Sequence, residues 1–254
     1  MSNSNYYYHQ RADLATQLRT DLESMRGIVS SVLIGLLLLL AGIRLLPVES
    51  TPLTAKVLCL LSLTIATAGI GAYVGRRIRG WLPMIGLLLL SIIGMMIVRA
   101  AGDGLLAIGL LTGWGFLNGM MLGPLVGLAI AEQGPGIVLQ SLTGTTGVML
   151  LAGAFTTLTG FDASRLAPLL MVGVIGLLVV GLVRIFVCFS RTVNMLYSAI
   201  GMLVFSGFFL FHFFRLERSE NTWDRAIDLT ISLYLTFANF FAFLLQFLLN
   251  TRRR

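Results

Sequence analysis

Long apolar runs alternate with short polar connections along most of this 254-residue chain. A helix needs about 20 apolar residues to cross a hydrocarbon core of roughly 30 Å. Eight segments meet this requirement, and each is predicted to be a membrane-spanning helix: 28–46, 55–75, 81–99, 105–131, 137–159, 166–187, 194–214 and 226–249. Because the connections are short, consecutive helices should be antiparallel. The predicted fold class is all-α, a polytopic transmembrane helix bundle.

The pattern divides the chain into a bundle and two polar ends. We expect a polar N-terminal tail at 1–27, a transmembrane bundle at 28–249 with its core at 55–249, and a basic tail at 250–254. The segment 28–46 is leucine-rich, and a helix along the membrane surface is its alternative interpretation.

Composition supports a membrane location. Hydrophobic residues make up 57% of the chain and charged residues only 11%, whereas soluble domains carry about 25% charged residues. The net charge of +7 does not indicate a nucleic-acid partner, because the basic residues lie between apolar spans, where membrane topology explains them. The expected partner of most of the surface is therefore the lipid bilayer.

The distribution of Lys and Arg predicts an orientation. If all eight segments cross and the N-terminus is inside, eleven of these residues lie on the inner side and seven on the outer side. The positive-inside rule then favours both termini inside. The final residues Arg252–Arg254 would meet anionic headgroups there.

A stripe of glycines marks the fourth predicted span. Gly115, Gly119, Gly123 and Gly127 recur every four residues, so one helix face lacks side chains and a neighbouring backbone can approach closely. Pro124 interrupts the backbone hydrogen bonds beside the third glycine and predicts a kink. The simplest interpretation is a packing device at the hub of the bundle.

The next span offers a partner for this glycine stripe. It opens with small and hydroxyl-bearing residues, Gln140–Gly147, whose composition suits close packing in lipid. We therefore expect this segment to pack against the glycine stripe.

His212 is the first candidate for ion or pH chemistry. It lies among five phenylalanines in the sequence FFLFHFFRL, within the seventh predicted span. Ionisable residues are costly inside a membrane and often functional, and small changes in surroundings move a histidine's titration across physiological pH. The alternative is a neutral histidine that hydrogen-bonds to a neighbouring helix or reaches the wet interface.

The last span carries the other candidates. Asp228, Ser232, Thr236 and Asn239 are spaced by four, four and three residues, which places them within about 80° on one helix face. Such a face should point to the bundle interior or a hydrated crevice. Alternatively, Asp228 is only a helix-end acid, and the amide and hydroxyls only hydrogen-bond between helices.

No catalytic or metal-binding constellation is present in the sequence. Cys59 falls in one apolar span and Cys188 directly follows another, and packing is their expected role. There is no HExxH sequence and no serine with a plausible base nearby. We expect neither an enzyme nor a bound metal or cofactor.

Several segments together resemble a known family. The fourth span, GWGFLNGMMLGPLVGLAI, is similar to a glycine-rich segment of the Bax-inhibitor (transmembrane Bax inhibitor motif) family, and ATAGIGAYVGRRIRGWL is similar to its first core helix. SLTGTTGVM resembles the next core helix, and FSGFFLFHFF with SLYLTFANFFAFLL resembles the last two. The resemblance covers residues 55–249 in the family's order. It implies a seven-helix core, to which 28–46 adds one extra N-terminal span, and a location in a bacterial inner membrane.

This chain departs from the family pattern at two positions. His212 and Thr236 stand where the pattern has aspartates in the last two core helices, and that acid pair is implicated in pH-dependent calcium leak. The resemblance also implies, for bacterial members lacking the pair, a modulator of a membrane-anchored AAA protease. An extra crossing span would invert the core relative to a seven-span relative whose N-terminus is inside, so the charge count conflicts with the topology of the family.

Two functions follow from these observations. The first is a regulator of membrane-protein quality control or stress survival, which would bind a membrane-anchored AAA protease. The alternative is a pH-sensitive leak for calcium or protons beside the last two helices.

Overall fold

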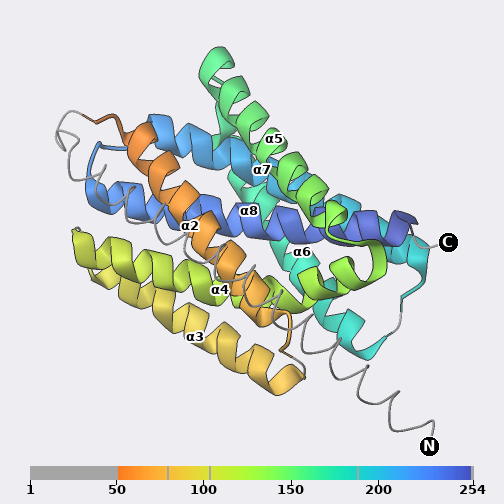
Figure 1. The fold of residues 1–254 in the computed structure, drawn as a ribbon. Coiled ribbons are helices and arrows are strands. Elements are labelled where there is room, and N and C mark those ends of the chain that lie inside the picture. The colour runs from red at the N-terminus through yellow and green to blue at the C-terminus, as the bar shows by residue number, and fades with distance from the viewer. Residues whose placement is uncertain (1–50, 79, 103, 188, 253–254) are drawn as a thin grey trace, which may run out of the picture. The chain divides into compact units, whose positions relative to one another are not determined.

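The computed structural model describes residues 51–252 apart from 79, 103 and 188. Seven of its helices are long and apolar enough to cross a membrane, and Figure 1 shows their arrangement. They are α2 (Leu53–Gly75), α3 (Trp81–Ala100), α4 (Leu105–Gln133), α5 (Gly136–Thr159), α6 (Ala167–Phe186), α7 (Arg191–Glu217) and α8 (Trp223–Arg252), with a 3-10 turn η1 (Ala163–Leu166) before α6.

The seven spans predicted for the core are confirmed, with ends displaced by three residues or fewer. The length and composition of the apolar runs were sufficient to predict these helices, because uninterrupted apolar runs of this size have few other stable forms in a membrane. The predicted span 28–46 lies outside the described residues.

Helix α8 occupies the centre of the described bundle. It contacts α2, α3, α4, α5 and α7, and Figure 1 shows it crossing behind α2. Its 30 residues correspond to a length of about 45 Å, so it extends beyond the hydrocarbon core. By contrast, α6 packs mainly on α7 and η1, with a hydrogen bond to α8 from Arg184 Nη1 to Gln246 Oε1 at 3.3 Å. It exposes most of its apolar side chains.

The two ends of the bundle differ in charge. We call the end with the α2–α3, α4–α5 and α6–α7 connections and the last turn of α8 the C-terminal face. Its described charged residues are almost all basic: Arg76, Arg77, Glu132, Arg184, Arg191 and Arg252. The opposite face mixes both signs: Lys56, Arg99, Asp162, Arg165, Arg215, Glu217, Arg218, Glu220, Asp224, Arg225 and Asp228.

The glycine stripe of α4 packs against α2. A Cβ atom added at Gly119 would overlap the backbone of Ala68, and one at Gly123 would overlap the backbone of Gly75. The contact is reciprocal, since a Cβ atom at Gly71 would overlap the Phe116 carbonyl. Contacts advance in the same direction along both helices, so α2 and α4 are parallel.

The outer glycines of the stripe follow the same pattern. Gly115 faces Thr64, and a Cβ atom at Gly127 would lie 3.3 Å from the Arg76 carbonyl oxygen. Pro124 lies inside α4, which continues as a helix to Gln133. The kink at Pro124 remains a prediction.

The predicted partner of the glycine stripe was wrong. Gln140–Gly147 belongs to α5, and Gly144 within it faces the Leu244 side chain of α8. Further along α5, Gly153 faces the Phe213 ring of α7. The small residues of α5 therefore accommodate bulky side chains, while α2 supplies a second small-residue face that matches α4.

A turn on the opposite face connects α5 to α6. Gly160 ends α5 with a φ of 61°, a left-handed conformation that glycine adopts without strain. Asp162 then accepts a hydrogen bond from the Ser164 backbone N–H at 3.0 Å. Hydrogen bonding by Ser164 lowers the pKa of the Asp162 carboxyl below its usual value.

Candidate functional site

Phenyl rings fill the contact between α7 and α8, which we call the α7–α8 seam. The rings of Phe205 and Phe243 lie 5.8 Å apart, and those of Phe209 and Phe240 lie 5.9 Å apart. Residue numbers rise on α7 as they fall on α8, as expected for antiparallel neighbours. This register places His212 at the level of Thr236.

His212 is buried within this seam. Its side chain is 7% exposed, and its ring stacks on Phe208 with centroids 5.8 Å apart. Its Nδ1 atom has no hydrogen-bond partner among the described residues. A proton added to this ring would place a charge among phenyl groups and one helical turn from Arg215.

The two hydroxyl candidates bond within their own helix. Thr236 donates to the Ser232 carbonyl oxygen at 3.0 Å, and Ser232 donates to the Asp228 carbonyl oxygen at 3.0 Å. Thr236 is buried and Ser232 is partly buried. Back-bonding of this kind satisfies a hydroxyl without any ligand or neighbouring helix.

Asp228 joins three helices at the opposite face. Its Oδ1 atom lies 3.0 Å from Arg99 Nη2 of α3, and its Oδ2 atom lies 3.6 Å from Arg215 Nη2 of α7. The Asp228 side chain is 30% exposed. It borders a hollow of about 560 Å³ whose lining includes Glu220 and Asp224. Asp228 is thus a partly exposed ionic link between α8, α3 and α7. Its position near the start of α8 did not by itself predict these two ion pairs.

Asn239 lies apart from the other candidates. It is exposed, and its Nδ2 atom donates to the Leu235 carbonyl oxygen at 2.8 Å. It borders a cavity of about 300 Å³ that Ser91 and Asn118 also line. There Ser91 Oγ donates to Asn118 Oδ1 at 3.2 Å.

The structure therefore divides the predicted polar face of α8. Asp228 and Asn239 border different hollows, and Ser232 and Thr236 border neither. His212 and Thr236 are brought together by register, while Asp228 is paired with arginines. Within the described part of the chain, no three His, Cys, Asp or Glu side chains are grouped to hold a metal ion.

Two further side chains were not identified from the sequence. Lys56 is 4% exposed, with its Nζ atom 5.0 Å from the centroid of the Trp223 ring. Tyr234 is 1% exposed, and its hydroxyl has no hydrogen-bond partner among the described residues. A lysine and a tryptophan at span ends are common features of membrane proteins, so neither the pair nor Tyr234 was conspicuous.

The fold and this site define a multi-pass helical membrane protein with a central last helix. The family model for "Inhibitor of apoptosis-promoting Bax1" matches residues 49–254. The chain therefore belongs to the Bax inhibitor family.

Individual relatives agree with this assignment. An uncharacterised membrane protein of Vibrio cholerae is 35% identical over 212 residues, covering 79% of this chain and 92% of the relative. Bax inhibitor 1 of Schizosaccharomyces pombe is 32% identical over 133 residues, covering 52% of this chain and 50% of the relative. A Helicobacter pylori protein is 30% identical over 130 residues, covering 51% of this chain and 55% of the relative.

Proposed function

We propose that this protein regulates membrane-protein quality control by binding a membrane-anchored AAA protease in a bacterial inner membrane. The observation that carries this proposal is the composition of the α7–α8 seam. His212 and Thr236 lie at one level of the seam, both are buried, and phenyl rings fill the remaining contact.

A conduction pathway for cations normally needs oxygen ligands or a fixed negative charge inside the membrane. Thr236 uses its hydroxyl within α8, and the sequence from 55 to 249 has no acid in the middle of a span. Asp228 is held by two arginines near the membrane surface. These features favour a protein that acts by contact over one that conducts ions.

The test is co-purification of the tagged, full-length protein with a membrane-anchored AAA protease from membranes of its own host. We expect the protease to be retained in mild detergent. Deleting residues 2–20 should abolish its retention and leave the bundle's elution volume unchanged, because a polar tail is the expected contact. If the truncated protein folds and still retains the protease, the tail is not the contact. If the full-length protein retains no protease, the proposal itself is contradicted.

One observation favours a second function, a pH-sensitive leak of calcium or protons. His212 Nδ1 is buried without a partner among the described residues, and protonation would set its charge against Arg215 one turn away. Such repulsion could loosen the α7–α8 seam at low pH.

A liposome flux assay between about pH 5 and 8 separates the two functions. The regulator proposal expects no calcium or proton flux above that of empty liposomes. Flux that rises at low pH and disappears in His212→Ala would instead support the leak. Replacing Phe211 by alanine, a change next to His212 on α7, is the matched control for altered packing.

A further inference from the structure

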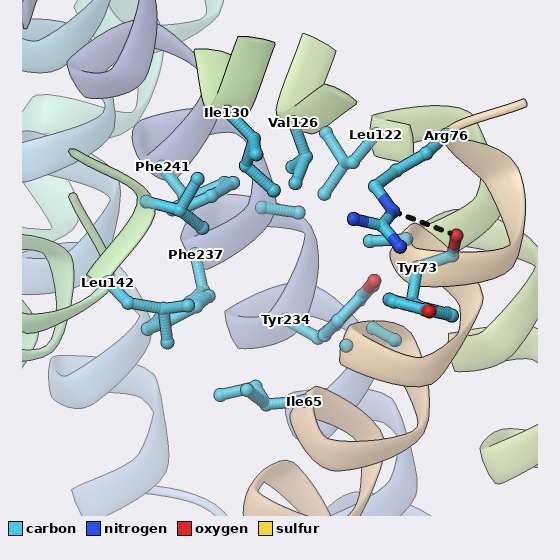
Figure 2. A pocket seen from close by; sticks show the side chains of 15 residues that line it. Ile65, Tyr73, Arg76, Leu122, Val126, Ile130, Leu142, Tyr234, Phe237 and Phe241 are labelled. Carbon is cyan, nitrogen blue, oxygen red and sulfur yellow. Dashed lines mark hydrogen bonds between the residues drawn. The ribbon is translucent and has the colours of Figure 1, made fainter. Parts of the chain in front are cut away.

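An apolar groove runs between α2, α4, α5 and α8. It encloses about 260 Å³, and its walls are almost entirely aliphatic and aromatic side chains. Figure 2 shows Ile65 at one end and Arg76 near the other, where Leu122 and Val126 also lie, with Phe237 at an intermediate level. The groove does not include His212 or Asp228, and so is separate from the candidate site described above.

The length of this groove matches one leaflet of a membrane. Ile65 and Arg76 are eleven residues apart on α2, which corresponds to about 16 Å along the helix. Half of the hydrocarbon core is about 15 Å. The groove therefore extends from the middle of the membrane to the C-terminal face.

A tyrosine with a buried hydroxyl lies against the groove. Tyr234 is 1% exposed and lines the groove, and its hydroxyl has no hydrogen-bond partner among the described residues. In Figure 2 this hydroxyl points toward Tyr73 and Arg76. A buried donor without a partner is uncommon. Because the oxygen itself is buried, a carbonyl oxygen of a bound molecule would satisfy it only after the neighbouring side chains move.

Positive charge is fixed at the mouth of the groove. The Arg76 Nε atom donates to the Tyr73 carbonyl oxygen at 3.2 Å, and the guanidinium carbon lies 3.7 Å from the centroid of the Tyr73 ring. Arg76 and Ile130 also line a second, more polar hollow of about 500 Å³, together with Arg77. The groove thus adjoins a basic hollow at the C-terminal face, with Arg76 and Ile130 in the wall of both.

We propose that this groove binds one acyl chain of an anionic phospholipid from the leaflet at the C-terminal face. The order of protein groups matches the order of groups in such a lipid. Apolar walls meet the hydrocarbon, the Tyr234 hydroxyl donates to an ester carbonyl, and Arg76 with Arg77 meets the phosphate. The groove's volume of about 260 Å³ is close to the lower limit for ligand pockets, which is about 300 Å³. It therefore accommodates one chain of the lipid and leaves the other in the bilayer.

The experiment uses full-length protein in nanodiscs that contain phosphatidylglycerol with a photoreactive diazirine in one acyl chain. After illumination, mass spectrometry should locate the label on the α4 and α8 walls of the groove, around Leu122, Val126 and Phe241. Label distributed evenly over the lipid-facing residues of α3 and α6, with no enrichment in the groove, would overturn the proposal.

Gly69→Leu is the blocking variant. Gly69 lines the groove, and a Cβ atom added there meets no atom within 4 Å, so the variant should fold. Its side chain displaces at least two methylenes of a bound chain, which predicts a loss of groove labelling of about tenfold. Gly86→Leu on α3 is the matched control, because its Cβ atom is equally unobstructed and lies outside the groove. Undiminished labelling in Gly69→Leu would overturn the proposal.

Two further variants test the contacts to the phosphate and to the ester carbonyl separately from the contact to the acyl chain. Arg76→Gln should reduce the preference for phosphatidylglycerol over phosphatidylcholine by about fivefold. Tyr234→Phe should lower labelling by the diacyl lipid and leave an ether-linked analogue, which lacks the carbonyl, unchanged. Photoreactive oleate is the competing ligand: labelling by oleate without labelling by phosphatidylglycerol would assign the groove to a free fatty acid and overturn the proposal.

Discussion

The α2–α4 pair and the α7–α8 pair pack by opposite means. In the first, glycines remove side chains from the contact, so the backbones of parallel helices approach closely. In the second, phenyl rings from antiparallel helices fill the contact. A backbone contact cannot adjust to added atoms, whereas a contact between rings can move. The α2–α4 pair should therefore tolerate almost no substitution, and the α7–α8 seam should tolerate changes that have compensating partners.

The largest effect is expected for Gly119→Leu. A Cβ atom at this position already overlaps the Ala68 backbone, and the rest of the side chain can be accommodated only by separating α2 from α4. The cost should exceed the roughly 1–3 kcal/mol typical of overpacked cores. We expect little or no folded monomer after detergent extraction, measured by fluorescence-detected size exclusion.

Gly113→Leu is the matched control on the same helix. A Cβ atom at Gly113 meets nothing within 4 Å, so this variant should elute like the wild type. Normal elution and thermal stability of Gly119→Leu would show that α2 and α4 are not in backbone contact.

A smaller effect is expected at the α7–α8 seam for Gly201→Ala. A Cβ atom there would lie 2.5 Å from the Phe243 ring, and a ring at the end of a side chain can shift. We expect a destabilisation of about 1–2 kcal/mol. The measurement is the loss of secondary structure during thermal or denaturant unfolding in detergent micelles.

The double variant Gly201→Ala with Phe243→Leu tests the stated cause. If the ring is the obstacle, the two changes should couple, and the pair should be less destabilised than the sum of its members by about 0.5 kcal/mol or more. Strict additivity would mean that the seam is as rigid as the α2–α4 contact. Gly119 offers no such rescue, because its obstacle is backbone.

The sequence predicted the positions of the helices better than it predicted the contacts between them. The apolar runs located all seven described spans, because a membrane admits few alternatives to a helix of that length. The glycine repeat in α4 identified a close contact but not its partner. Both α2 and α5 contain small residues, and periodicity on one helix does not say which neighbour it meets. The matching positions Thr64, Ala68, Gly71 and Gly75 were nevertheless visible in the sequence.

The candidate site was predicted less completely than the fold. The spacing of Asp228, Ser232, Thr236 and Asn239 places them near one face of α8, but α8 has helices on several sides. Residues within 80° of one another therefore meet different neighbours. Asp228 is paired with α3 and α7, whereas Asn239 borders a separate cavity. Only tertiary structure distinguishes these surroundings.

The smallest effect is expected for Asp228→Asn, at the end of the α7–α8 seam where ionic contacts replace phenyl rings. The substitution removes the carboxylate that pairs with Arg99 and Arg215. Partly exposed ion pairs contribute about 1 kcal/mol or less, which predicts a decrease in midpoint temperature of about 2–4 °C for a bundle of this size.

Asp224→Asn is the matched control, since Asp224 is exposed in the first turn of α8 and also loses a charge near the helix N-terminus. Salt provides the second distinction, because screening weakens exposed pairs. The difference between Asp228→Asn and wild type should therefore shrink in about 1 M salt. A difference that persists at high salt would mean that Asp228 acts as a buried hydrogen-bond acceptor. The charged end of the seam would then be as intolerant of change as the α2–α4 contact, and the contrast between the two helix pairs would apply only to the phenyl rings.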